Sequence, residues 1–199
     1  MNFLKSVISP LAAVLTAGVL AVGPSSAQGT YPAPGKNITL VLPFAAGSGT
    51  DTTTRIISKD LAKALGTSIV IENKPGANGS IAASYVARAE PDGYTIFVTT
   101  NTSHSANPYL LKNMTYDPIK DFTPIARTGD LPFMLVIDPK LPVNSVADLI
   151  ALAKKEPGKY SYASGSSSAI VSGATFATLA GIDLLHVPYK SSPPALTDV

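Results

Sequence analysis

Apolar and polar positions alternate along the chain in blocks that predict strands and helices in turn. Residues 38–43 form a continuous apolar run, which is typical of a strand buried on both faces of a sheet. Residues 52–65 repeat apolar positions at helical spacing, and Gly66 then ends the helix. Further strands are predicted at 68–72, 94–99, 160–163 and 183–187, and helices at 80–89, 108–112, 146–155, 167–180 and from 194. This alternation predicts an α/β fold with parallel strands and right-handed crossovers.

Residues 122–139 interrupt the alternation and predict a passage between two lobes. Two strand-like apolar runs flank Gly129 and Asp130 in this segment. Because the α/β pattern resumes after it, we expect lobe 1 at 28–127, lobe 2 at 128–199 and a cleft between them. A hinge motion about the segment would close the lobes on a ligand.

The first 27 residues predict an export signal. Lys5 provides the positive charge, residues 11–22 the apolar centre, and residues 25–27 (SSA) the small-residue cleavage pattern. The apolar centre is shorter than the ~20 residues that span a bilayer, although an uncleaved anchor is the alternative. We expect a mature chain from Gln28 in a bacterial periplasm, and the absence of cysteine excludes disulfides.

Composition excludes several classes of function. The chain has 199 residues, 45% of them hydrophobic, which is enough for a packed core. Its net charge is only +2 and no basic cluster occurs, which argues against a nucleic-acid partner. Two histidines without any cysteine argue against a transition-metal site, so we expect no metal and no cofactor.

A glycine-rich loop, residues 43–51 (PFAAGSGTD), joins the first predicted strand to the first predicted helix. A helix that starts directly after a strand leaves its first N–H groups unpaired, and these attract an anion. The loop lacks the lysine of a phosphate loop and the third glycine of a dinucleotide loop, and Asp51 would repel a pyrophosphate. A small carboxylate remains, held by N–H groups and by the hydroxyls of Ser48 and Thr50. The alternative is that these hydroxyls only cap the helix.

A second loop, residues 160–168, again runs from a strand through glycine and hydroxyls into a helix. Two such helix N-termini, one in each lobe, would hold the two ends of a dicarboxylate. Residues 99–103 follow the third strand and could line the same rim, although a solvated polar loop is an equal alternative.

Five motifs, taken in order, resemble the tripartite tricarboxylate transporter receptor family, the Bug-type periplasmic solute receptors. They are residues 42–51 (LPFAAGSGTD), 70–79 (VIENKPGANG), 91–94 (PDGY), 116–122 (YDPIKDF) and 186–190 (HVPYK). The resemblance implies a two-lobed periplasmic binding protein fold of type II. It also implies a monomeric receptor that captures a di- or tricarboxylate, an amino acid or an aromatic acid for a membrane permease.

The ligand-binding residues expected from the loop chemistry and the resemblance come from four parts of the chain. They are Phe44, Gly47, Ser48, Gly49, Thr50 and Asp51; Thr100 and Asn101; Ser164, Gly165, Ser166, Ser167, Ser168 and Ala169; and Tyr189. Two departures stand out: Ala169 occupies a place where the family often has histidine, and family members continue beyond residue 199. We therefore expect a chain that lacks the C-terminal part of the fold and binds its ligand weakly, or not at all, by itself.

An exported serine hydrolase is the alternative function. Residues 165–169 (GSSSA) are one residue away from the G-x-S-x-G motif, and Asp183 and His186 follow. These two residues lie in or beside one short strand, however, where alternation directs them to opposite faces. A hydrogen bond to the backbone is the ordinary expectation for His186.

Overall fold

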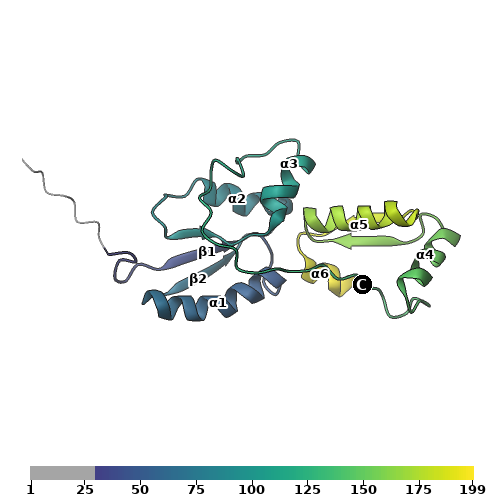
Figure 1. Cartoon of the computed structure of the whole chain (residues 1–199), viewed down its shortest axis with the longest axis horizontal. Coiled ribbons are helices and arrows are strands. Elements are labelled where there is room, and N and C mark those ends of the chain that lie inside the picture. The colour runs from purple at the N-terminus through teal and green to yellow at the C-terminus, as the bar shows by residue number, and fades with distance from the viewer. Residues whose placement is uncertain (1–29) are drawn as a thin grey trace, which may run out of the picture. The chain divides into compact units, whose positions relative to one another are not determined.

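A three-stranded parallel sheet, in the order β2-β1-β3, organises the first half of the fold (Figure 1). The computed structural model describes residues 30–199, so the predicted export signal lies outside the described residues. Strand β1 (Ile38–Leu42) pairs with β2 (Ile69–Asn73) on one side and β3 (Thr95–Phe97) on the other. The central position of β1 explains its continuous apolar run, because both of its faces are covered.

Two helices cover the two faces of this sheet. Helix α1 (Gly49–Leu65) and helix α2 (Ser80–Ala87) lie on opposite sides of it in Figure 1. Helix α1 starts three residues earlier than predicted and ends at Gly66, whose φ of 62° is the left-handed conformation that glycine adopts readily. The core beside them consists of Ile38, Leu40 and Leu42 with Leu65, Ile69, Ile71, Tyr94, Ile96 and Val98.

Short helical turns at the ends of the strands form the region between the two halves. Turn η1 (Ala77–Gly79) precedes α2, and β3 is followed by the π-helical turn η2 (Thr102–Ala106) and helix α3 (Asn107–Leu110). The ring of His104 packs against the rings of Phe97 and Phe122, and Phe122 also contacts Tyr116. This aromatic cluster fixes η2 beside the sheet.

The two strand-like runs in residues 122–139 have no strand partner in the described chain. These residues form no strand, and residues 123–137 are exposed, including the apolar run 131–137 (LPFMLVI). A strand is stable only when a neighbour pairs with its N–H and C=O groups, and no strand of the described chain lies along this segment. Strand propensity was present here, but the pairing partner was not.

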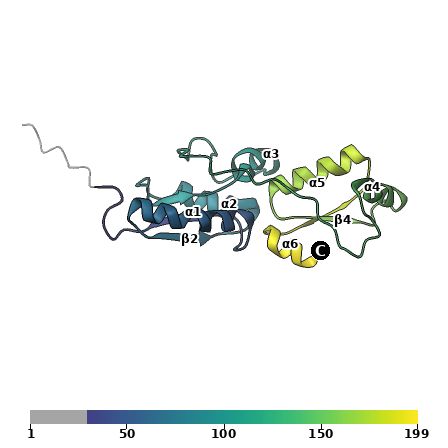
Figure 2. The same ribbon diagram turned by 60° about the horizontal axis from the view of Figure 1, so that its bottom comes forward.

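The second half contains a two-stranded parallel sheet. Strands β4 (Ser161–Ser164) and β5 (Leu185–Pro188) pair directly, and α4 (Val146–Lys155) precedes them. Helix α5 (Ser167–Ala180) connects the strands, with the bounds that the sequence predicts, and α6 (Ser192–Asp198) follows. Figure 2 shows α5 and α6 on opposite sides of β4. The boundary between residues 127 and 128 stays a prediction.

No helix in residues 30–199 combines the length and the apolar character that a membrane span requires.

The alternation of strands and helices is confirmed as an α/β architecture, and every β-strand pair in the described chain is parallel. The strands β1 and β4 both end at a glycine-containing loop that leads into a helix, which brings the two predicted loops into equivalent positions.

Candidate functional site: two helix N-termini

The first loop is organised by its own polar groups. Ser48 is the N-cap of α1, and its Oγ accepts the N–H of Asp51 at 3.3 Å. The N–H of Gly47 donates to Oδ2 of Asp51 at 2.9 Å. The Ser48 hydroxyl therefore caps the helix, as the alternative interpretation of the loop expects. The carboxylate of Asp51 accepts the N–H of Gly47 inside the loop.

Asp51 is a buried carboxylate held by three partners. Besides Gly47, Nε of Arg55 donates to it at 2.9 Å and Nδ2 of Asn73 at 3.0 Å, while the residue is only 3% exposed. The Arg55 guanidinium, together with the two other donors, lowers the pKa of Asp51 to about 2 although burial opposes the shift. The side chain is thus ionised at neutral pH and its charge is compensated within the loop.

The first two N–H groups of α1 stay available. Within residues 30–199, the main-chain N–H groups of Gly49 and Thr50 have no hydrogen-bond acceptor, because the Ser48 cap serves only Asp51. Such groups carry the positive end of the helix dipole. The start of α1 is therefore a candidate position for an anion, with donors from the backbone alone.

The second loop has the same construction. Ser166 is the N-cap of α5, and its Oγ accepts the N–H of Ala169 at 3.2 Å. The N–H groups of Ser167 and Ser168 have no acceptor in the described part of the chain. The start of α5 is therefore the second candidate position for an anion, with its two unpaired donors on residues that are 0% and 6% exposed.

The hydroxyls of the second loop contact the first half of the fold instead of pointing to solvent. Ser167 Oγ donates to Oδ1 of Asn107 at 2.6 Å, and Ser168 Oγ donates to Oδ1 of Asn101 at 2.9 Å and lies 2.9 Å from Oγ1 of Thr102. Both serines are at most 6% exposed. The two halves thus meet through buried, uncharged hydrogen bonds.

Ser191 links the two loops from a third direction. Its Oγ accepts the N–H of Ala45 in the first loop at 3.2 Å. Its backbone packs so closely on the second loop that a Cβ on Gly165 would lie 2.3 Å from the Ser191 carbonyl carbon. Only glycine fits at this contact, which brings the loops of both halves against one residue.

The other predicted site residues take different places. Phe44 is buried and its carbonyl accepts the Asn73 amide, and Thr100 Oγ1 accepts the N–H of Thr102 within its own turn. The Tyr189 hydroxyl donates to Asp198 of α6 at 2.7 Å. Thr100 and Tyr189 therefore make local contacts, whereas Asn101 joins the contact between the halves.

The described residues do not assemble a hydrolase triad. His186 Nε2 lies 2.6 Å from Oγ of Ser164, which replaces the expected backbone partner of His186, and its ring stacks on Tyr162. Ser167, the residue at the nucleophile position of GSSSA, is bonded to Asn107. No hydrogen bond or ion pair in residues 30–199 connects Asp183 to His186.

Sequence reasoning missed three residues that organise the site: Asn73, Asn107 and Ser191. Asn73 closes β2 and Asn107 starts α3 before a proline, which are ordinary places for a polar side chain. Their roles arise from contacts with residues 22, 60 and 146 positions away. No local sequence pattern reports contacts of that range.

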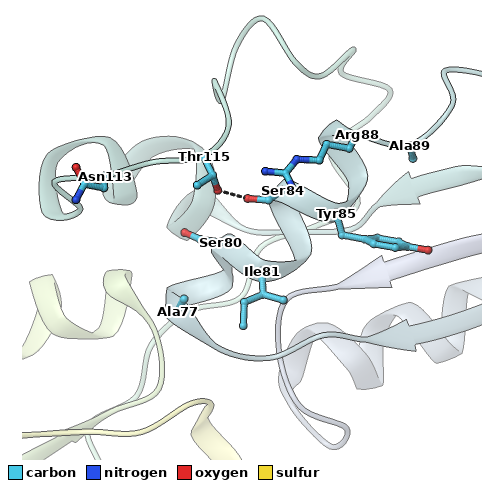
Figure 3. Close-up of a pocket in the computed structure, with 9 residues that line it drawn as sticks. All are labelled: Ala77, Ser80, Ile81, Ser84, Tyr85, Arg88, Ala89, Asn113 and Thr115. Atoms are coloured by element: carbon cyan, nitrogen blue, oxygen red, sulfur yellow. Dashed lines mark hydrogen bonds between the residues drawn. The ribbon is translucent and has the colours of Figure 1, made fainter.

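A cavity of about 670 Å³ lies away from these loops, on the outer face of α2 (Figure 3). Ile81 and Tyr85 of α2 line it together with Asn113 and Thr115. Ile81 is 52% and Tyr85 46% exposed, and no ionised pair or buried polar group converges there. The candidate site therefore remains at the two helix N-termini.

Known proteins resemble this chain over most of its length. A family model described as the tripartite tricarboxylate transporter family receptor matches residues 53–199. The chain belongs to the tripartite tricarboxylate transporter receptor family. Protein BugT of Bordetella pertussis is 34% identical over 189 residues, which cover 94% of this chain and 56% of BugT. A UPF0065 protein of Bordetella bronchiseptica is 36% identical, with coverage of 95% and 55%.

Solved structures of this receptor family share the fold. An R. palustris protein solved with adipate has a TM-score of 0.78 and 41% identity, covering 83% of this chain and 56% of its own. MatC from Rhodopseudomonas palustris, with bound malate, has a TM-score of 0.76 and 34% identity, with coverage of 82% and 56%. The periplasmic binding protein BugD has a TM-score of 0.69 and 33% identity, with coverage of 83% and 56%. These likenesses confirm the predicted periplasmic-binding-protein fold, and the chain spans about half the length of the relatives it matches.

Proposed function

We propose that this chain is part of a periplasmic receptor that binds a small carboxylate for a tripartite tricarboxylate-type transporter. The observation that carries the proposal is the pair of helix N-termini whose first two N–H groups are unpaired in the described chain. Family membership and the adipate and malate bound by the two R. palustris proteins support it. A di- or tricarboxylate, an amino acid or an aromatic acid offers the required anionic group.

The donors of Gly49, Thr50, Ser167 and Ser168 hold the carboxylate oxygens of the ligand. Hydrogen bonds to an ionised acceptor are stronger than neutral ones, and the helix dipoles add to them. Asp51 does not repel the ligand, because Arg55 and its other donors compensate its charge. The two loops that present these groups are shaped by their other residues, which are Phe44, Gly47, Ser48, Gly165, Ser166 and Ala169.

Export, processing and partners follow from the same proposal. The chain is delivered to the periplasm by residues 1–27, with cleavage after Ala27, and acts there as a monomer. The carboxylate passes from it to the permease subunits of the transporter. Neither a cofactor nor a metal ion takes part, since neutral backbone donors suffice for a carboxylate.

A proline substitution tests the N–H of Gly49 without changing the helix. Gly49 is the first residue of α1, where proline is favoured, and Ser48 has the extended ψ of 160° that a residue before proline needs. Gly49→Ala is the matched control, because it keeps the N–H and its Cβ would lie 3.7 Å from Leu131, an ordinary contact. Binding of adipate, malate and the uncharged adipamide is measured by isothermal titration calorimetry.

We expect weak binding of the acids, because the chain spans about half the length of its relatives, and no binding of adipamide. Losing one hydrogen bond to a charged group costs about 1.5–3 kcal/mol, so Gly49→Pro should weaken binding roughly 10- to 150-fold relative to Gly49→Ala. Equal binding of adipate and adipamide would contradict the proposal. Equal affinities of the two variants would remove Gly49 from the site.

A further inference from the structure

Asn107 occupies the point where three loops meet. Its side-chain amide donates to the carbonyl of Asn78 at 2.9 Å and to Tyr116 Oη at 3.1 Å, and its Oδ1 accepts the Ser167 hydroxyl at 2.6 Å. The residue is fully buried. One side chain therefore connects the turn after β2, the segment after α3 and the first turn of α5.

The first half of the fold holds Asn107 in a fixed orientation. Tyr116, itself 6% exposed, donates its hydroxyl to the carbonyl of Ser103 at 2.7 Å while it accepts from Asn107. Both amide hydrogens of Asn107 are thus directed into the first half, which leaves Oδ1 facing α5. A buried amide with partners on each side permits little movement, because any displacement leaves a polar group unsatisfied.

On the other side, Asn107 holds the residue that starts the second helix. Ser167 is the first residue of α5 and is fully buried, and its N–H is one of the unpaired donors. The hydrogen bond from the Ser167 hydroxyl to Asn107 fixes the direction of the Ser167 N–H relative to the loops of the first half. Through this contact the first turn of α5 is held against the first half of the fold.

We propose that Asn107 is a positioning residue that sets the spacing between the two helix N-termini, and through it the length of the diacid that is accepted. The inference rests on the proposed function, since it assumes that the two N-termini hold the two ends of one ligand. Asn107 itself contacts no ligand in this scheme. It acts through Ser167.

The test compares three variants with a matched control. Ser167→Ala removes only the bridging hydroxyl, Asn107→Ala removes the whole junction, and Asn107→Asp keeps the acceptor for Ser167 but loses the donors to Asn78 and Tyr116. Ser172→Ala is the control, because Ser172 lies in the same helix and its hydroxyl bonds only to the Ser168 carbonyl, at 2.9 Å. Affinities for succinate, glutarate and adipate give the length preference, and hydrogen exchange of the Ala169 and Ile170 amides reports the first turn of α5 without ligand.

In Ser167→Ala and Asn107→Ala we expect exchange at Ala169 and Ile170 to accelerate on the order of tenfold, as for a lost buried hydrogen bond. The ratio of affinities among the three diacids should fall toward one, whereas Ser172→Ala should keep both the exchange rates and the ratio. Asn107→Asp should be at least as disruptive as Asn107→Ala, because its buried carboxylate would face the Asn78 carbonyl without a donor. A purely structural residue would lower stability and leave the ratio unchanged.

Two outcomes overturn the inference. One is that Ser167→Ala matches Ser172→Ala in its amide exchange rates and in its preference for diacid length. This comparison also decides the question if Asn107→Ala does not fold. The other is a folded Asn107→Ala variant with an unchanged diacid ratio. If the unmodified chain binds none of the diacids, the proposed function fails, and unaccelerated exchange in Ser167→Ala then separately refutes the positioning contact.

Discussion

Replacing Asp51 with asparagine should make the chain less stable at neutral pH by an amount that the structure sets. The substitution keeps the size of the side chain but removes the charge that pairs with Arg55 at 2.9 Å. A pKa lowered from 3.8 to about 2 corresponds to roughly 2.4 kcal/mol at 1.36 kcal/mol per unit. Since the Arg55 side chain is 51% exposed, solvent screens part of the attraction, and we expect a loss of about 1–2 kcal/mol.

The pH dependence identifies the origin of the loss. The folded-state pKa of Asp51 lies below its unfolded value, so its contribution is complete above pH 4 and disappears as pH falls through about 2. The free energies of unfolding of the chain and of Asp51→Asn should therefore converge between pH 4 and pH 2. At pH 7 the difference should lower the melting temperature of the variant by about 2–8 °C.

Urea unfolding followed by circular dichroism at pH 7, 5, 4 and 3 measures this difference. Asp148→Asn serves as the control, because Asp148 also has a lowered pKa but is exposed beside the N-cap Ser145 of α4. The control should change stability less than Asp51→Asn does. A constant gap between the chain and Asp51→Asn from pH 7 to pH 3 would refute the reasoning, because the loss would then not come from ionisation.

Three further predictions follow from single contacts. Gly165→Ala should destabilise the fold severely, because the new Cβ would lie 2.3 Å from the Ser191 backbone. A severe loss of stability lowers the melting temperature by several degrees, so a melting temperature within about 2 °C of the parent chain would contradict this contact. Ser166→Ala should cost about 1 kcal/mol through loss of the N-cap of α5, measured by urea unfolding, with Ser166→Asp expected to restore most of it. Burial lowers the pKa of His104, so its NMR titration midpoint should lie below that of a free histidine and stability should decline as pH falls through it; a midpoint at or above the free value would be inconsistent with the packed ring.

Local sequence signals determined both ends of α4 and α5 and the end of α1. Ser145 caps α4, and Gly66 ends α1, as the composition of those positions predicts. Helix α5 has the predicted bounds of Ser167–Ala180. These features depend on residues within one turn of each other, so the information lies in the adjacent sequence.

Segment 122–139 marks where that information stops. Its two apolar runs resemble strands, yet they form none, because strand formation needs a partner from elsewhere in the chain. The loop residue Asp51 is a similar case. The sequence located it at a candidate anion site, but only the fold showed that Arg55 and Asn73 occupy its carboxylate.

The sequence by itself therefore determined the α/β alternation, the two glycine- and serine-containing loops and the helices that follow them. The tertiary structure decided which polar groups have partners: within residues 30–199 the backbone N–H groups of Gly49 and Ser167 have no acceptor, while the hydroxyl of Ser167 is bound to Asn107, 60 residues away. The physical reason is that a helix start leaves its first N–H groups unpaired in any sequence, whereas a side chain bonds to whatever partner the fold brings within about 3 Å.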